Sequence, residues 1–135
     1  MSILFLSEHK DLLERKITGL VSVIAPSGFP YITPIWFVEF EGKIYFSTES
    51  TRKKGEFLAK NDKIGFNITH PDGHPYLTVV GKANIRRKDE FNEYKKVLGL
   101  IFDRYMDPSK KDEGIEKNLA NESRILIEIV PERVI

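Results

Sequence analysis

The stretch "GLVSVIAPSGFPYITPIWFVEFEGKIYFST", residues 19–48, decides the fold that the sequence predicts. It is rich in β-branched and aromatic residues, which favour strands, and the turn-forming groups "PSG" (26–28) and "EG" (41–42) divide it into three runs. Three extended runs joined by two tight turns indicate an antiparallel meander. Because Pro30 and Pro34 have no N–H to donate, we expect the second run to lie at an edge, a bulge or an opening of the sheet.

Three more extended runs follow, at residues 63–69, 76–87 and 123–130. The turn "HPDGHP" (70–75) joins the first two of these as a hairpin. Gly81, inside the longer run, predicts a bulge or a barrel corner. Six strands with evenly spaced turns and no βαβ alternation predict a mostly β fold with flanking helices, a six-stranded antiparallel split β-barrel.

Four helical segments are expected, and one of them is expected outside this barrel. Residues 88–105 repeat apolar side chains at three- and four-residue spacing, which predicts an amphipathic helix packed on the sheet. A shorter helix is expected over residues 8–17 with Ser7 as its cap. A helix of about two turns is expected near residues 52–60, and the polar residues 108–122 predict a short helix and a loop.

The composition limits the classes of function. The chain has 135 residues, 41% of them hydrophobic and 30% charged, which predicts one domain over residues 1–135. The net charge of +1 gives no general basic field, so we expect no nucleic-acid partner and only local anion binding. The chain has no cysteine. The first ten residues are too short for a signal peptide and lack its basic flank, and no apolar run reaches membrane-spanning length. We therefore expect a cytoplasmic protein without a membrane partner.

A run of three cations, Arg52, Lys53 and Lys54, stands where the third strand ends and the short helix begins. The start of a helix carries partial positive charge, so cations there are repelled unless an anion lies between. Hydroxyl side chains precede the run: Ser47, Thr48, Ser50 and Thr51. A phosphate accepts hydrogen bonds from hydroxyls, free helix N–H groups and cations, and this stretch supplies all three. Because no "GxxxxGK" loop is present, the pattern favours a monophosphate on a larger apolar body over a nucleoside triphosphate. The alternative is that the cations form a solvated helix face.

The order and spacing of these segments resemble the FMN-binding split-barrel family, the group of pyridoxamine phosphate oxidase and its shorter relatives. The segments that match are "SGFPYITPIWF" (27–37), "GKIYFST" (42–48) and "TRKKGEFLAKNDKIGF" (51–66). In that family a strand ends in threonine, and a cation pair then opens a helix with an apolar residue four positions later. The positions with this spacing here are Thr48, Lys53, Lys54 and Leu58. Arg52 stands where the family often has serine, so Thr51 or Ser50 is expected to supply the hydroxyl, and "ND" at residues 61–62 replaces the family's "NP".

The resemblance implies a cofactor, a set of binding residues and an assembly. It implies an FMN-dependent oxidoreductase or flavin reductase that acts on a small-molecule substrate and uses NADH or NADPH as electron donor. The backbone of residues 33–36 would face the flavin ring, and the cations would hold the phosphate. The implied cofactor-binding residues are Thr33, Pro34, Ile35, Trp36, Ser47, Thr48, Thr51, Arg52, Lys53 and Lys54. The flavin would lie between the subunits of a homodimer, and no catalytic residue is assigned because the flavin carries the redox chemistry.

Several alternatives remain open at this point. A deazaflavin-dependent reductase shares the "TPIWF" type of strand, and a flavin carrier or sensor would need no turnover. The more distant alternative is a small barrel that binds single-stranded nucleic acid on surface aromatic residues. His70 and His74 flank one turn, but no third ligand is indicated, so we expect no metal site. Because the chain ends at Ile135 without the C-terminal substrate-binding segment of pyridoxamine phosphate oxidases, we do not expect vitamin B6 synthesis.

Overall fold

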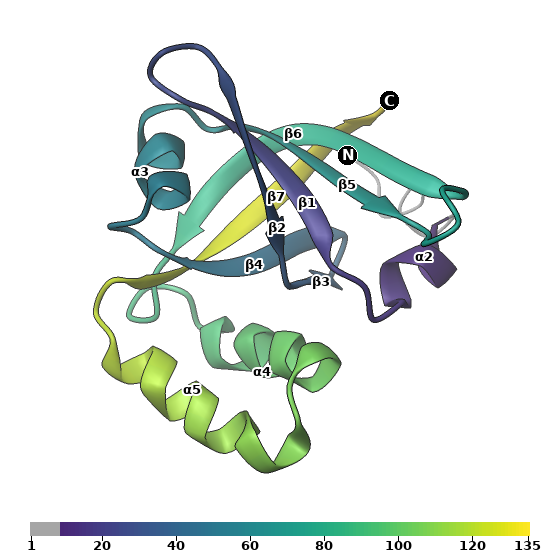
Figure 1. The fold of residues 1–135 in the computed structure, drawn as a ribbon. Helices are drawn as coiled ribbons and strands as arrows, with labels where there is room; N and C mark the ends of the chain where they lie inside the picture. Colours follow the sequence, from purple (N-terminus) through teal and green to yellow (C-terminus); the bar gives the residue numbers. More distant parts are fainter. Residues whose placement is uncertain (1–8) are drawn as a thin grey trace.

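A computed structural model describes residues 9–135, and its strands form one antiparallel sheet in the order β2-β1-β5-β6-β7-β4-β3. The sheet curls into a half-barrel, with α4 and α5 lying together on one side of it (Figure 1). The mostly β, antiparallel fold class is therefore as predicted. The strands are β1 (Gly19–Ile24), β2 (Pro30–Ile35), β3 (Phe37–Phe40), β4 (Lys43–Glu49), β5 (Lys63–Thr69), β6 (Tyr76–Arg86) and β7 (Arg124–Val134).

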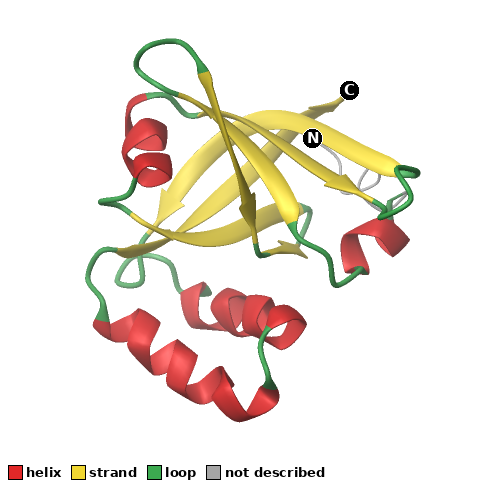
Figure 2. Cartoon of the chain, viewed as in Figure 1, coloured by secondary structure: helices red, strands yellow, loops and turns green. Residues whose placement is uncertain are grey.

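The sheet has seven strands rather than the expected six, because the run of residues 30–40 divides at Trp36 into β2 and β3. These two strands occupy opposite edges of the sheet although one residue separates them. The sheet must therefore curl until its two edges meet at Trp36, and Figure 2 shows the curled sheet in yellow. The expected three-strand meander is wrong: β1 pairs with β2 and β3 with β4, in two separate hairpins. The edge position expected from Pro30 and Pro34 is confirmed by β2.

Two local predictions about glycines agree with the structure. Glu41 and Gly42 both have positive φ, 52° and 81°, and form the two-residue loop that joins β3 to β4. The register between β6 and β7 shifts between Val80 and Gly81. A side chain at Gly81 would collide with the carbonyl oxygen of Val130, so this bulge needs glycine.

The sheet has a packed cluster on each face. The inner face, inside the curl, carries Ile44 and Phe46 of β4. The outer face carries Tyr45 of β4 and Leu126 of β7, and α4 covers them. Alternation of side chains along each strand divides the apolar residues between the two clusters.

The helices are α2 (Lys10–Glu14), α3 (Lys53–Lys60), α4 (Tyr94–Tyr105) and α5 (Lys111–Ala120), with a 3-10 turn at Pro108–Lys110. Helices α3 and α5 lie where they were predicted, whereas α4 begins later than the expected residue 88. Residues 87–91 form turns in which the Arg87 carbonyl accepts from the N–H of Phe91, and Phe91 reaches the α4 cluster from there. The predicted cap, Ser7, lies outside the described residues. None of the helices among residues 9–135 is long and apolar enough to cross a membrane.

A charged side chain, Glu128 of β7, is 1% exposed on the outer side of the sheet. It accepts hydrogen bonds from Tyr45 Oη at 2.7 Å, Arg86 Nη2 at 2.9 Å and Asn84 Nδ2 at 3.0 Å. Burial raises the pKa of the Glu128 carboxyl, but the bonds from Arg86, Asn84 and Tyr45 outweigh it and hold that pKa below its ordinary value. The carboxylate is therefore ionised at neutral pH, and it joins β4, β6 and β7.

Candidate functional site

A cavity of about 340 Å³ opens between β2, β4 and the start of α3. Residues from four elements line it: Tyr31, Thr33, Ser47, Thr48, Arg52, Lys53, Lys54 and Arg124. Six of the sequence-predicted site residues are brought together here, namely Thr33, Ser47, Thr48, Arg52, Lys53 and Lys54. The other four, Pro34, Ile35, Trp36 and Thr51, do not line this cavity.

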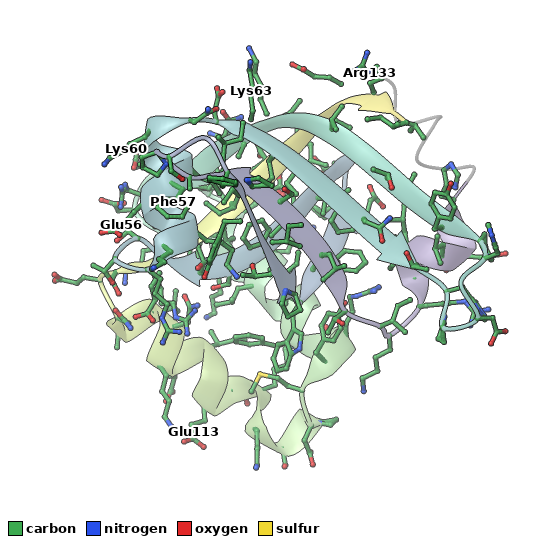
Figure 3. The ribbon with its side chains drawn as sticks, turned by 45° about the horizontal axis from the view of Figure 1, so that its top comes forward. Glu56, Phe57, Lys60, Lys63, Glu113 and Arg133 are labelled. Carbon is green, nitrogen blue, oxygen red and sulfur yellow. The ribbon has the colours of Figure 1, made fainter. Side chains whose placement is uncertain are left out.

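Helix α3 is fixed against the barrel by its own sequence. A side chain at Gly55 would place its Cβ 2.5 Å from the Glu49 carbonyl oxygen and 2.9 Å from Ser50 Cα, so only glycine permits this approach. Phe57 packs edge-on against Tyr31 of β2, with ring centroids 5.5 Å apart, and Leu58 is buried. Figure 3 shows Glu56 and Lys60 projecting from the outer side of the same helix. The helix start therefore stands directly at the end of β4.

The backbone at this helix start is open to a ligand. Arg52 is the N-cap residue, and no side chain caps α3. The first N–H groups of any helix have no partner inside it, and they carry the positive end of the helix dipole. With no cap among residues 9–135 to satisfy them, these groups favour an anion in the cavity.

Arg52 is largely committed to a carboxylate. Its Nε donates to Glu49 Oε2 at 2.7 Å. Hydrogen bonds from Ser123 and Asn121, followed by that from Arg52, hold the pKa of the Glu49 carboxyl below its usual range. The carboxylate of Glu49 therefore offsets part of the repulsion expected from three cations at the helix start, although the charge of Arg52 still acts on Lys54.

Lys54 is the half-buried cation of the cavity. Its Nζ donates to Thr33 Oγ1 at 2.9 Å and lies 5.9 Å from the centre of the Phe46 ring. Burial, and secondly the charge of Arg52, lower the pKa of its ammonium group. Within residues 9–135, no carboxylate lies within 4.0 Å of the Lys53 or Lys54 ammonium. A bound anion would offset the desolvation of Lys54, which is the behaviour expected of a ligand-binding lysine.

Arg124 is the lining cation that the sequence analysis missed. It begins β7 and pairs in register with Glu49 of β4, which brings it beside the cavity. It also lines a neighbouring cavity of about 270 Å³, together with Ser47, Asn118 and Lys117. The pairing of β4 with β7 carries Arg124 to the site, and nothing in its local sequence indicates that partner.

The strand residues expected along a flavin ring lie at the corner between β2 and β3. Trp36 is 43% exposed and stacks on Tyr105 of α4, with ring centroids 5.3 Å apart and an angle of 5° between the planes. Tyr105 is held in turn by its hydroxyl, which donates to the Ile17 carbonyl at 2.8 Å. Pro34 is exposed and Ile35 is buried. Trp36 therefore has one ring face supported by Tyr105 and remains partly open to solvent.

The histidine turn contains no cluster of metal ligands. His70 Nδ1 accepts from the Asp72 N–H at 3.1 Å. The ring of His74 packs against that of Tyr76, with ring centroids 5.6 Å apart. No group of three His, Cys, Asp or Glu side chains able to hold a metal occurs in the described part of the chain.

The family is shown by comparison with known sequences. The model of the family described as pyridoxamine 5′-phosphate oxidase matches residues 5–135. The chain belongs to this family. Its members share the split-barrel fold that the described residues adopt, so the resemblance stated from the sequence is confirmed. No protein with a curated functional description matches the chain.

Solved structures of the pyridoxamine 5′-phosphate oxidase fold agree with this assignment. A conserved hypothetical protein from Mycobacterium tuberculosis superimposes with a TM-score of 0.80 at 22% identity, covering 99% of this chain and 82% of the other. An F420 reductase gives a TM-score of 0.70 at 23% identity, covering 93% of this chain and 94% of the other. General stress protein 26 from Bacillus anthracis gives a TM-score of 0.69 at 15% identity, covering 96% of this chain and 91% of the other. At these identities the likeness establishes the fold.

Proposed function

We propose that the protein binds FMN and acts as a flavin-dependent oxidoreductase, with the FMN phosphate in the cavity at the start of α3. The observation that carries the proposal is Lys54, a half-buried cation without a carboxylate partner among residues 9–135, beside an uncapped helix start. Hydroxyls of Thr33, Ser47 and Thr48 complete a set of donors that suits a phosphate. Membership of a family whose members bind flavin supports the same assignment.

The roles of the chain's own residues follow from their positions. Lys54 and Lys53 would neutralise the phosphate, and the first N–H groups of α3 would donate to it. Arg52 would contribute less, because Glu49 already holds its guanidinium. Arg124 would close the far side of the cavity. Pro34, Ile35 and Trp36 would border the ring system, with Trp36 held by Tyr105. When bound, the flavin supplies the redox chemistry, and the protein orients it and limits its contact with water.

The second element of the proposal is a homodimer, with the flavin between subunits. The outer face of β1 and β2 exposes Leu20 and Ile32, and Ile32 is 61% exposed. Beside them a shallow groove of about 200 Å³ is lined by both of these residues together with Gly65 and Phe66 of β5. Apolar surface of this kind on a small barrel suits burial against a second copy.

A deazaflavin-dependent reductase is the alternative that a specific observation favours. The cavity beside the phosphate site shares Ser47 and Arg124 with it and adds one further cation, Lys117. A cofactor with a longer acidic tail would use this cation. The structural likeness to an F420 reductase supports this candidate at the level of the fold.

Binding measurements test the proposal. The purified protein should take up FMN with a change in flavin absorption or fluorescence, and Lys54→Ala should weaken FMN binding by roughly ten- to a hundredfold, since a charge-assisted hydrogen bond contributes about 1.5–3 kcal/mol. Riboflavin, which lacks the phosphate, should bind both proteins alike. The matched control is Lys60→Ala, a lysine on the outer side of the same helix (Figure 3), which should leave FMN binding unchanged. Equal FMN affinity in wild type, Lys54→Ala and Lys53→Ala would show that the cations are a solvated face.

A further inference from the structure

A chain of three buried or half-buried polar side chains leads from α4 through α5 to the cavity wall. Tyr94 Oη lies 2.7 Å from Asn118 Oδ1, and Asn118 Nδ2 lies 3.2 Å from Ser47 Oγ. Tyr94 and Asn118 are buried at 1% and 6% exposure. Ser47 lines the proposed phosphate cavity, whereas Asn118 lines only the neighbouring one. A hydrogen-bonding effect of Asn118 on a ligand in the phosphate cavity therefore passes through Ser47.

The burial of Tyr94 decides which groups donate and which accept in this series of hydrogen bonds. Burial raises the pKa of the Tyr94 phenol to about 12, so the hydroxyl keeps its proton. Asn118 is the one hydrogen-bond partner of that hydroxyl among residues 9–135. A buried donor left without an acceptor is costly, so the phenol donates to the amide oxygen. The amide NH₂ group of Asn118 must then face Ser47.

Ser47 is left with a proton to donate. Its oxygen accepts from the Asn118 amide, and a hydroxyl has one proton and two acceptor lone pairs. In the described part of the chain, no acceptor takes the Ser47 proton. The cavity in front of it is also lined by cations, whose side chains are donors only, namely Arg52, Lys53, Lys54 and Arg124. Its lining hydroxyls, on Tyr31, Thr33 and Thr48, accept no bond from Ser47 in the structure.

We propose that Asn118, oriented by Tyr94, is a positioning residue that fixes Ser47 as a hydrogen-bond donor to the phosphate of the bound cofactor. This inference rests on the proposed FMN site and adds a specificity determinant to it. Ser47 then adds a fixed donor to the cations that line the cavity, which favours an acceptor-only group such as a phosphate dianion over a neutral hydroxyl.

A double-mutant cycle tests the inference with FMN and riboflavin as probes. Ser47→Ala should raise the FMN dissociation constant roughly ten- to a hundredfold by removing a hydrogen bond to a charged group. In Asn118→Asp the carboxylate accepts from both Tyr94 and Ser47, so the Ser47 proton turns away from the phosphate. The new charge also repels the phosphate directly, but it does so whether or not Ser47 is present. Asn118→Asp should therefore weaken FMN binding about tenfold more in the wild-type background than in the Ser47→Ala background. Riboflavin affinity should not change.

Equal loss of FMN affinity from Asn118→Asp in the two backgrounds would overturn the inference, because a merely structural or electrostatic role needs no Ser47. If the buried carboxylate prevents folding, Asn118→Leu replaces it. That change frees the Ser47 hydroxyl to rotate among three staggered positions. Asn118→Leu should therefore weaken FMN binding up to about threefold in the wild-type background and should have no effect in the Ser47→Ala background. Failure of the proposed function is separate: there, Lys54→Ala would leave FMN binding intact.

Discussion

Substitution of Gly55 by alanine tests the link between helix packing and the proposed phosphate site. The added Cβ would lie 2.5 Å from the Glu49 carbonyl oxygen and 2.9 Å from Ser50 Cα, and both are backbone atoms. An ordinary contact needs about 3.4 Å or more, so α3 must move away from the end of β4 by roughly 1 Å. The move would separate Lys54 Nζ from Thr33 Oγ1, now 2.9 Å apart.

Two opposing terms set the size of the effect on stability. Overpacking against backbone costs about 2–3 kcal/mol, the upper part of its usual range, because neither atom sits on a flexible side chain. Alanine regains about 1 kcal/mol over glycine in a helix. The free energy of unfolding should therefore fall by about 1–2 kcal/mol, which for a chain of this length lowers the melting temperature by roughly 3–8 °C. FMN binding should weaken by about tenfold or more, since the displaced helix start no longer aims its donors at the phosphate.

Thermal unfolding of the apoprotein and FMN titration measure the two effects, and Gly99→Ala is the matched control. Gly99 lies inside α4, where an added Cβ meets only the Lys111 side chain, at 3.8 and 3.9 Å. This variant should be more stable than wild type by about 0.5–1 kcal/mol and should bind FMN normally. A Gly55→Ala protein with wild-type stability and FMN affinity would refute the claim that this close approach positions the site.

Three further predictions concern assembly, acid stability and redox activity. Ile32→Arg should convert a dimer into a monomer in sedimentation experiments and weaken flavin binding; a wild-type protein that is a stable monomer with flavin bound would contradict the dimer. Glu128→Gln should lower the free energy of unfolding at neutral pH by about 1–3 kcal/mol. Because the folded pKa of Glu128 is depressed, its contribution is present above the ordinary carboxyl pKa and lost as pH falls through the folded pKa, so unfolding curves of the two proteins should converge in acid. Under anaerobic conditions NADH or NADPH should bleach the FMN-loaded protein; no bleaching with either, nor with a reduced deazaflavin, would favour a carrier or sensor.

The sequence predicted the elements whose causes are local. Turn glycines, alternating apolar residues and the three- and four-residue spacing of α4 are properties of neighbouring residues, and the corresponding strands and helices appear in the structure. The break at Trp36 was missed because the β-branched and aromatic residues that predict a strand continue through residues 30–40 without a turn residue at Trp36. Only the closing of the sheet, a property of the whole chain, explains why the strand ends there.

The candidate site was predictable to a similar extent. The cations and hydroxyls near α3 are close in sequence, and the resemblance to a known family added Thr33, which now accepts from Lys54. Asn118 and Arg124 were missed because strand pairing and helix packing bring them to β4. The hydrogen bond between Asn118 and Ser47 joins residues 71 positions apart. The bond between Arg52 and Glu49 was within reach of the sequence, since the two are three residues apart.

The position of β7 between β6 and β4 bears on how the protein folds during synthesis on the ribosome. Four strands pair side by side in the order β2-β1-β5-β6. The β3–β4 hairpin pairs with none of them, and its link to the rest of the sheet is β7. Without β7, these two fragments of the sheet, the β3–β4 hairpin and the other four strands, lack the strand that pairs with both, and unpaired strand edges are prone to misassembly. The cavity draws on both fragments, with Thr33 from one and Ser47 from the other. If the proposed cofactor binds in this cavity, it would contact both fragments only after β7 has joined them, and its uptake would then follow the pairing of β7.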